Sequence, residues 1–306
     1  MRAIYWKEMA DHFGRKRFLL LLGIVVLGVL WGAFIDMETL VVSGSGFFFL
    51  DVFTTTLGLP LSLLSFISFF GPIIGIALGF DAINSERTQG TLSRVLAQPV
   101  YRDALFNGKF LAGLTTLAIV LVSMGIGVVG LAMFRIGIAP SGEEMLRLIG
   151  FAAVGIAYLA LWLAMSMTAS IFLRNTVASA LVSIGVWIVT SFFILIAATA
   201  LAQQIVPEVE TSEDALRRFN AQLWISRTSP SALFSESTSI LLDPIEGRLL
   251  TPLALNVERT QGLLSAPVAA GQSLQLVWPH IVAMVAMIAS MLAVSYIRFM
   301  REEIRA

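Results

Sequence analysis

Six long runs of apolar residues, none of which contains a charged side chain, constrain this chain more than any other feature. A membrane-spanning helix needs roughly 20 apolar residues, at 1.5 Å each, to cross a hydrocarbon core about 30 Å thick. The first run is at the short end of that requirement, and the other five exceed it. The runs are residues 18–35, 57–80, 110–134, 148–173, 176–202 and 274–297. The sequence therefore predicts an all-α, polytopic membrane protein with six transmembrane helices.

The composition agrees with this architecture. Of the 306 residues, 57% are hydrophobic and 13% are charged, whereas an ordinary soluble domain has about 25% charged residues. Six spans occupy roughly half of the chain, which favours one helical membrane domain over residues 1–306. The formal net charge is zero, so nothing indicates a nucleic-acid partner. The absence of cysteine excludes disulfides and thiolate metal sites.

The distribution of basic residues predicts the orientation, because Lys and Arg flanking a span resist translocation. With both termini inside, 13 of the 20 basic residues fall in inner segments. They are Arg2, Lys7, Arg15, Lys16, Arg17, Arg87, Arg94, Arg102, Lys109, Arg174, Arg298, Arg301 and Arg305. We therefore expect a multi-pass protein of the plasma or inner cell membrane, with its N-terminus and C-terminus in the cytoplasm.

The segment before the first run, residues 2–17, has a helical pattern. Tyr5, Met9 and Phe13 recur every four residues, and charged side chains, Glu8 among them, fall on the other side. This pattern predicts a short amphipathic helix that lies on the inner membrane surface. An ordinary basic flank is the alternative.

The second run carries small residues at helical spacing. Gly71, Gly75 and Gly79 follow one another at intervals of four, and small residues at that spacing let helix backbones approach closely. Two interpretations stay open. The glycine face lies either at a subunit interface or substrate path, or in tight packing within the bundle.

Residues 203–273 form the one substantial hydrophilic segment, an extracytoplasmic loop before the last span in the orientation above. Thr211 with Asp214 matches a capping box, and Ser229-Pro230 is a second helix start. Asp243-Pro244 ends the second pattern. We expect two short amphipathic helices there.

The residue inventory argues against catalysis by this chain. It has two histidines, His12 and His280, and it lacks an HExxH pair and a Gly-x-Ser-x-Gly elbow. Gly108-Lys109 fails the P-loop pattern because residue 103 is Asp, and phosphate cradling needs that glycine-rich loop. Neither enzymatic activity nor a cofactor is expected in this chain. Because the spans hold no Asp, Glu, Lys or Arg for ion coupling, energy for transport would come from another subunit.

The inner loop, residues 81–109, holds the densest set of distinctive residues. Gly90 accepts unusual backbone conformations and Thr91 suits a helix start, whereas Pro99 ends the helix that follows. We expect a short helix under the membrane that inserts into a partner's groove. The candidate residues for this contact are Asp81, Glu86, Arg87, Gly90, Thr91, Arg94, Pro99, Arg102 and Lys109.

These residues and the overall plan resemble the permease subunits of ABC-2 type ABC transporters. The resemblance is carried by Asp81-Ala-Ile-Asn-Ser-Glu-Arg-x-x-Gly-Thr-Leu92, then Gln98-Pro-Val-x-Arg102, then Gly108-Lys109. It is closest to the branch that includes the NosY permease of nitrous-oxide reductase maturation and the gliding-associated GldF permease. The likeness covers the whole chain as a plan, although its specific motifs lie within residues 81–109.

The resemblance implies a half-transporter that moves a substrate outward. Two permeases, identical or paralogous, would pair in the membrane, each seated on a cytosolic ABC ATPase that binds ATP and magnesium. Glu86-Arg87 and residues 90–102 would then form the helix that couples to the ATPase, and residues 2–17 the interfacial helix. Membrane lipid surrounds the pair, and the long outer loop allows an extracytoplasmic accessory protein.

A second hypothesis is a membrane scaffold or assembly factor that works without ATP through its outer loop. It predicts no ATPase partner and an unaltered function when the inner loop is changed.

Overall fold

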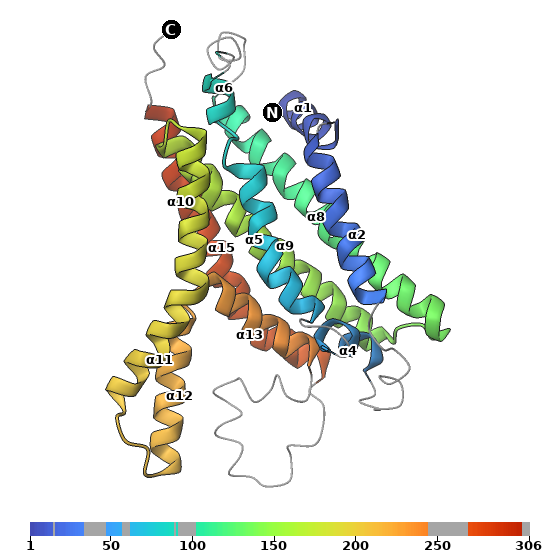
Figure 1. Cartoon of the computed structure of the whole chain (residues 1–306), viewed down its shortest axis with the longest axis vertical. Coiled ribbons are helices and arrows are strands. Elements are labelled where there is room, and N and C mark those ends of the chain that lie inside the picture. The colour runs from blue at the N-terminus through green and yellow to red at the C-terminus, as the bar shows by residue number, and fades with distance from the viewer. Residues whose placement is uncertain are drawn as a thin grey trace.

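The computed structural model describes residues 1–14, 16–33, 47–56, 62–88, 90, 102–243 and 269–301, and within them all regular structure is helical. The helices are α1 (Arg2–Gly14), α2 (Lys16–Ala33), α4 (Phe48–Thr54), α5 (Leu63–Gly79), α6 (Asn84–Thr88), α8 (Arg102–Ile136), α9 (Gly142–Phe172), α10 (Thr176–Ile188), the π-helix η1 (Val189–Phe193), α11 (Ile194–Ile205), α12 (Ser212–Ser226), α13 (Pro230–Leu242) and α15 (Ala270–Arg301). Figure 1 shows them as one elongated bundle.

Within the residues that the structure describes, five stretches of helix are long and apolar enough to cross a membrane, so this is a multi-pass membrane protein. They are Leu63–Thr88, Asp103–Ile136, Gly142–Phe172, Thr176–Ile205 and Ala270–Arg301, and they coincide with the second to sixth expected spans. The first expected span coincides with the 18-residue α2, which is not one of the five. In the described part of α2, apolar side chains such as Leu22, Val26 and Leu27 are exposed.

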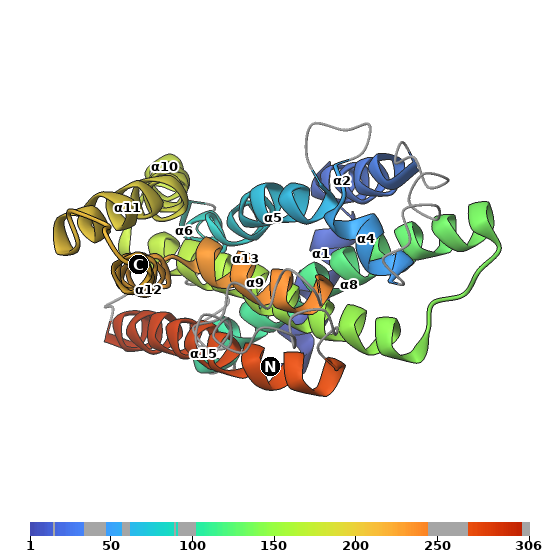
Figure 2. The same cartoon turned by 90° about the horizontal axis from the view of Figure 1, so that it is seen from below.

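Helix α9 is the centre of the bundle. Figure 2 shows it between α5 on one side and α15 on the other, and it also contacts α8, α10 and α13. In its most apolar 18-residue stretch, 72% of the residues are buried, against 11% for the span that comprises α10, η1 and α11. The α10–α11 span is therefore peripheral, and its apolar side chains face outward from the bundle.

The glycine face of α5 packs against α9 of the same chain. A Cβ atom on Gly75 would lie 2.9 Å from the Leu159 carbonyl oxygen, and one on Gly79 would lie 2.8 Å from the Leu163 carbonyl oxygen. Side chains at these positions would force the two backbones apart. Of the two interpretations of this motif, packing within the bundle is confirmed for the described residues.

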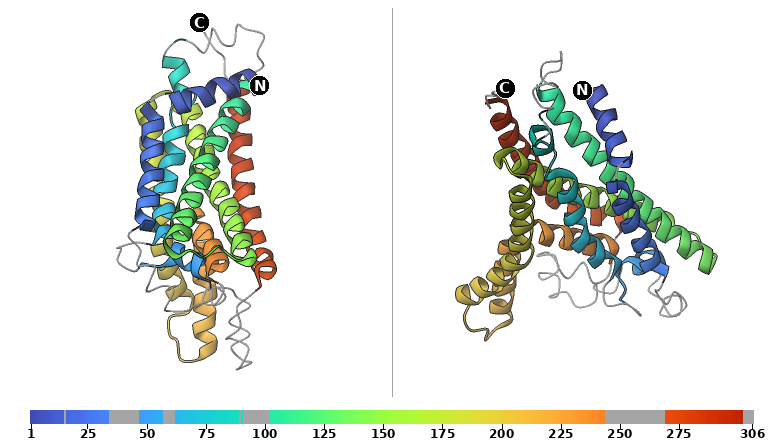
Figure 3. Two further views of the ribbon diagram at one scale, coloured as in Figure 1. Left: turned by 90° about the vertical axis from the view of Figure 1, so that its right-hand side faces the viewer. Right: turned by 45° about the horizontal axis from the view of Figure 1, so that its top comes forward.

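The two ends of the bundle differ in what they hold. Helices α1 and α6 and the C-terminal part of α15 lie at one end, which we call the α1 end, and the α11–α12 hairpin projects from the other, the α12 end (Figures 1 and 3). In the left view of Figure 3, α1 runs across the ends of the long helices rather than along them.

Helices α12 and α13 confirm the helix starts expected between residues 203 and 273. Thr211 and Asp214 form a capping box, in which each side chain accepts a hydrogen bond from the other's backbone amide. The Ser229 hydroxyl accepts from the Ala232 amide, and Pro230 occupies the first turn. Helix α13 ends at Leu242, as expected from Asp243. Pro244 lies outside the described residues.

The N-terminal segment is helical as predicted, but its buried face is different. The buried residues of α1 are Ile4, Glu8, Met9 and His12, so the assignment of Glu8 to a solvent face is wrong. The reason is a buried lysine on α8, described below, which a pattern within residues 2–17 does not contain.

Candidate functional site

Helix α6 is docked onto the C-terminal end of α9. The amides of Ile83 and Asn84 both donate to Ser170 Oγ, each at 3.2 Å, and Asn84 Nδ2 donates to the Leu173 carbonyl at 2.7 Å. The last carbonyls of a helix lack partners within the helix and are available to such donors. The segment that follows α5 is therefore fixed to the end of the central helix.

Arg87 reinforces this docking. Its Nη1 donates to the carbonyls of Ile171 at 3.3 Å and Ser170 at 3.4 Å, and to Asn84 Oδ1 at 3.2 Å. A cation at the C-terminus of a helix is favoured by the helix dipole. Arg87 thus binds the end of α9 within this chain, whereas the sequence interpretation gave it a contact with a partner.

Glu86 lies in a cluster of four charges from three helices. Its Oε1 is 3.3 Å from Lys7 Nζ on α1 and 3.3 Å from Lys109 Nζ on α8. Lys109 Nζ is also 2.8 Å from Glu8 Oε1. We call Lys7, Glu8, Glu86 and Lys109 the α1-end charge cluster. Its formal charges balance, and it joins α1, α6 and α8 at one point.

Lys7 is the exposed member of this cluster and Lys109 the buried one. The side chain of Lys7 is 56% exposed and that of Lys109 is 5% exposed. Partial burial opposes the charge on Lys7, but the nearby carboxylates of Glu8 and Glu86 outweigh it and raise its pKa. The contacts of Lys109 with Glu8 and Glu86 are therefore more shielded from water than those of Lys7, and more costly to break.

Further contacts hold α1 against α8. His12 Nδ1 lies 3.0 Å from Thr116 Oγ1, and the Tyr5 hydroxyl donates to Thr115 Oγ1 at 3.2 Å. A Cβ atom on Gly108 would lie 3.0 Å from Ile4 Cγ2, so the glycine permits close contact between the two helices. Because Glu86 on α6 contacts both helices, a displacement of α6 would also move α1 and α8.

The candidate residues from the sequence are only partly brought together. Glu86 and Lys109 meet in the cluster. Asp81 is buried in the turn after α5, where its carbonyl accepts from the Ser85 amide at 2.9 Å. Gly90 has a φ of +63°, a conformation that favours glycine. Thr91, Arg94 and Pro99 lie outside the described residues, and Arg102 begins α8.

Sequence reasoning missed Glu8, Asn84 and Ser170 as members of this assembly. Glu8 and Lys109 are 101 residues apart, and Ser170 is one of several serines in an apolar span. Of these three residues, Asn84 is the one that could have been found from the sequence, because it lies within the motif of residues 81–92.

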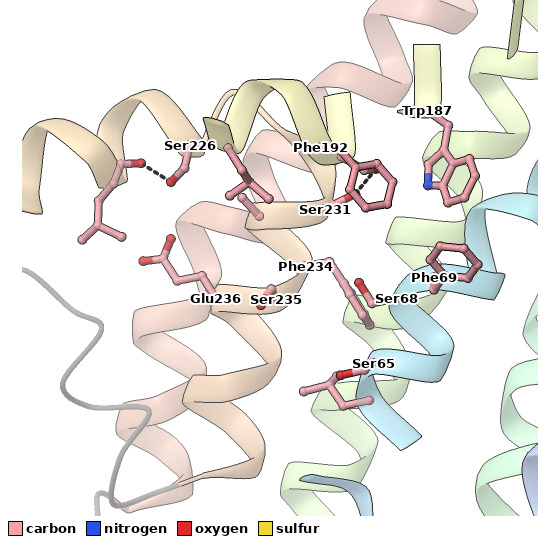
Figure 4. Close-up of a pocket in the computed structure, with 15 residues that line it drawn as sticks. Ser65, Ser68, Phe69, Trp187, Phe192, Ser226, Ser231, Phe234, Ser235 and Glu236 are labelled. Carbon is pink, nitrogen blue, oxygen red and sulfur yellow. Dashed lines mark hydrogen bonds between the residues drawn. The ribbon is translucent and has the colours of Figure 1, made fainter. Parts of the chain in front are cut away.

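The α12 end holds a second feature, a cavity of about 480 Å³. It lies between α5, the α10–α11 span, α12 and α13 (Figure 4). Aromatic, aliphatic and hydroxyl side chains line it. The labelled residues in Figure 4 are Ser65, Ser68, Phe69, Trp187, Phe192, Ser226, Ser231, Phe234, Ser235 and Glu236.

At the edge of this cavity, Glu236 on α13 binds two cationic or potentially cationic groups. Arg227, at the end of α12, donates to both carboxylate oxygens, and His280 Nε2 on α15 lies 3.1 Å from Glu236 Oε2. Burial disfavours the carboxylate charge, but the hydrogen bonds from Arg227 and His280 outweigh it and lower the pKa of Glu236 to about 2. We call these residues the α12-end triad.

Comparisons with known proteins agree with this architecture. The family model described as "ABC-2 family transporter protein" matches residues 2–304. A curated relative from Pseudomonas aeruginosa, described as "Probable ABC transporter permease protein NosY", is 32% identical over 156 residues. That match covers 49% of this chain and 53% of the relative, so the chain spans about half the length of the curated relative it matches.

Proposed function

This chain belongs to the ABC-2 family of transporter proteins, and on that premise we propose that it is the permease subunit of an ATP-driven exporter. Two permeases, identical or paralogous, pair in the membrane, and each is seated on a cytosolic ABC ATPase. ATP and magnesium bind in that ATPase and not in this chain. The permease itself carries out no chemistry. It carries the substrate outward as its conformation changes.

The proposed topology has six spans, with α2 as the first and both termini in the cytoplasm. The α1 end is then cytoplasmic, α1 is the interfacial helix, and residues 203–273 are extracytoplasmic. Two observations support this orientation. Helix α1 and the C-terminal part of α15 lie at the same end of the bundle (Figure 1), and basic residues gather at that end, as the positive-inside rule requires for the cytoplasm.

The α1-end charge cluster is the observation that carries the coupling role. A push from an ATPase on residues 81–109 would act on α6, which is bound to α9 through Asn84 and Arg87 and to α1 and α8 through Glu86. Interactions of this kind have discrete arrangements and can be switched. The candidate coupling loop is therefore connected to the central helix of the bundle and to the helix that lies across its end.

The first experiment identifies the partner. A tagged chain is purified from its native membrane in mild detergent, and proteins that accompany it in stoichiometric amount are identified by mass spectrometry. We expect a P-loop ATPase. Replacement of residues 91–100 by a Gly-Ser segment of equal length should remove the ATPase and leave the chain in the membrane. Glu213→Lys, at the α12 end, is the control that should retain it.

Two outcomes would contradict the proposal. If no ATPase accompanies the chain and an extracytoplasmic protein does, the ATP-independent scaffold is favoured. If the ATPase stays bound after the replacement, the inner loop is not its docking site.

A further inference from the structure

Several serine hydroxyl groups line the cavity at the α12 end, and those of Ser191 and Ser231 are linked to each other. Ser191 Oγ and Ser231 Oγ are 2.7 Å apart, and Ser231 Oγ lies 3.1 Å from the Tyr158 hydroxyl. The Tyr158 hydroxyl also donates to the Ser68 carbonyl at 3.0 Å. Within a membrane protein, such groups at a cavity wall offer hydrogen bonds that lipid chains cannot satisfy. The wall therefore favours a ligand that carries hydrogen-bonding groups.

The opposite part of the lining is aromatic. The rings of Phe69 and Trp187 meet edge to face, with centroids 5.2 Å apart, and Phe192 lies 6.2 Å from Trp187. Figure 4 shows Phe69 on α5 beside Trp187 and across from the serines of α13. Aromatic side chains bind apolar bodies and flat rings through large contact areas. The lining thus offers an aromatic surface in addition to its hydroxyl groups.

No unpaired charge faces this cavity from the residues that the structure describes around it. Glu236 is the one charged residue among those that line it, and Arg227 and His280 take up its carboxylate. A cationic ligand would have to displace Arg227 from Glu236. An anionic ligand would lie near the Glu236 carboxylate and would find no unpaired cation among the described lining residues. Burial of an unpaired charge in such a place is costly.

We propose that this cavity binds an uncharged amphiphile, with its apolar or aromatic body against Phe69 and Trp187 and its hydroxyl or amide groups at Ser68, Ser191 and Ser231. The cavity volume of about 480 Å³ is in the range of small-molecule sites, roughly 300–1,000 Å³. The statement that this occupant is the transported substrate rests on the proposed function. Binding itself does not.

The test uses four probes that share a dansyl group and differ in one short arm. The arms are hydroxyethyl, ethyl, aminoethyl (a cation) and carboxymethyl (an anion). The full chain is placed in phosphatidylcholine nanodiscs, and saturable energy transfer from tryptophan to dansyl is measured at neutral pH. We expect the hydroxyethyl probe to bind about tenfold or more tightly than either charged probe, because neither charge finds a free partner.

Two variants locate the site. Ser231→Ala should weaken binding of the hydroxyethyl probe roughly two- to tenfold, which corresponds to the loss of one hydrogen bond. It should leave binding of the ethyl probe unchanged. Ser68→Leu fills the cavity and should abolish saturable transfer. Ser290→Leu, at an exposed position on α15, is the matched control and should have no effect.

The proposal is overturned if all four probes give equal or non-saturable signals, which is partitioning into lipid, or if Ser231→Ala weakens the ethyl probe as much as the hydroxyethyl probe. Because binding is measured on the permease without an ATPase, the two proposals fail separately. Selective binding in a chain that has no ATPase partner would keep the site and remove the transport role. An ATPase partner without selective binding would do the reverse.

Discussion

At the scale of single residues, Lys109 is the most buried member of the α1-end charge cluster and contacts two carboxylates. Its ammonium lies 2.8 Å from Glu8 and 3.3 Å from Glu86, and its side chain is almost entirely buried. Removal of one partner from a buried ion pair leaves an uncompensated charge, which costs far more than the loss of a surface pair. The α1-end charge cluster is therefore sensitive at Lys109 and tolerant at Lys7.

The first prediction follows from this difference. Lys109→Met should lower the free energy of unfolding by about 3–5 kcal/mol, because Glu8 and Glu86 both lose their buried cationic neighbour. Lys7→Met should cost about 1 kcal/mol or less. Thermal unfolding of both variants in detergent checks the difference.

A double variant separates electrostatics from packing. Glu8→Gln combined with Lys109→Met should recover part of the lost stability, because the carboxylate nearest to Lys109 is then no longer charged. If the double variant is no more stable than Lys109→Met alone, the cost lies in packing and the cluster has no electrostatic role.

At the α12 end, Glu236 sets a pH dependence. Its pKa is lowered from 4.5 to about 2 in the folded chain, so its ionised form favours folding. This contribution is fully present above pH 4.5 and is lost as the pH falls toward 2. The groups that face it are Arg227 and His280.

The second prediction compares Glu236→Gln with the wild type from pH 6 to pH 2.5. The wild type should be the more stable above pH 5, and the gap should shrink continuously below pH 4.5. Chemical unfolding followed by tryptophan fluorescence measures it. Glu213→Gln, at an exposed position on α12, should show no such gap. A gap that does not change with pH would mean that the triad does not lower the pKa of Glu236.

Among the elements, α5 has two faces with different roles. Its glycines contact the backbone of α9, and its serines Ser65 and Ser68 line the cavity at the α12 end. The close contact on one face fixes the position of the other. The position of α9 therefore determines, through α5, where Ser65 and Ser68 lie in the cavity wall.

The third prediction tests this contact. Gly75→Ala should destabilise the protein by about 1–3 kcal/mol, because the new methyl group would lie 2.9 Å from the Leu159 carbonyl oxygen. Gly125→Ala on α8, where a Cβ atom meets nothing within 4 Å, is the control and should be neutral or slightly stabilising. Equal effects at both sites in thermal unfolding would contradict the close packing of α5 on α9.

For the whole molecule, the absence of cysteine makes the orientation easy to measure. Single cysteines are introduced at Glu213 on α12 and at Arg174, in the turn between α9 and α10. We expect a membrane-impermeant maleimide to label the Glu213→Cys variant in intact cells and the Arg174→Cys variant only after permeabilisation. The reverse pattern would invert the proposed topology.

Local patterns in the sequence correctly predicted the features that depend only on residues close together in the chain. The capping residues Thr211 and Ser229 start the helices that they predicted, since a cap depends on residues three positions away. The apolar runs predicted the long helices for a similar reason, because length and hydropathy are properties of one segment. Family membership followed from the motif in residues 81–109 and is confirmed by the match over residues 2–304.

The pairing of distant residues was not predictable in this way. No periodicity in residues 2–17 indicates that Glu8 is buried against Lys109, and none in α13 indicates that Glu236 meets His280 on α15. The sequence around a charged residue on a short helix shows the same pattern whether that residue contacts water or a side chain 101 residues away.

The amino-acid sequence alone indicated a helical membrane protein of the ABC-2 family, because its apolar runs are long enough for helices that cross a hydrocarbon core and the inner-loop motif is distinctive. Which helix faces meet became known from the three-dimensional fold. The fold placed the α5 glycines on α9, gathered four charges from three helices at the α1 end, and formed a hydroxyl-lined cavity at the α12 end. Those contacts depend on the relative position of whole helices, which close packing of all the side chains together fixes.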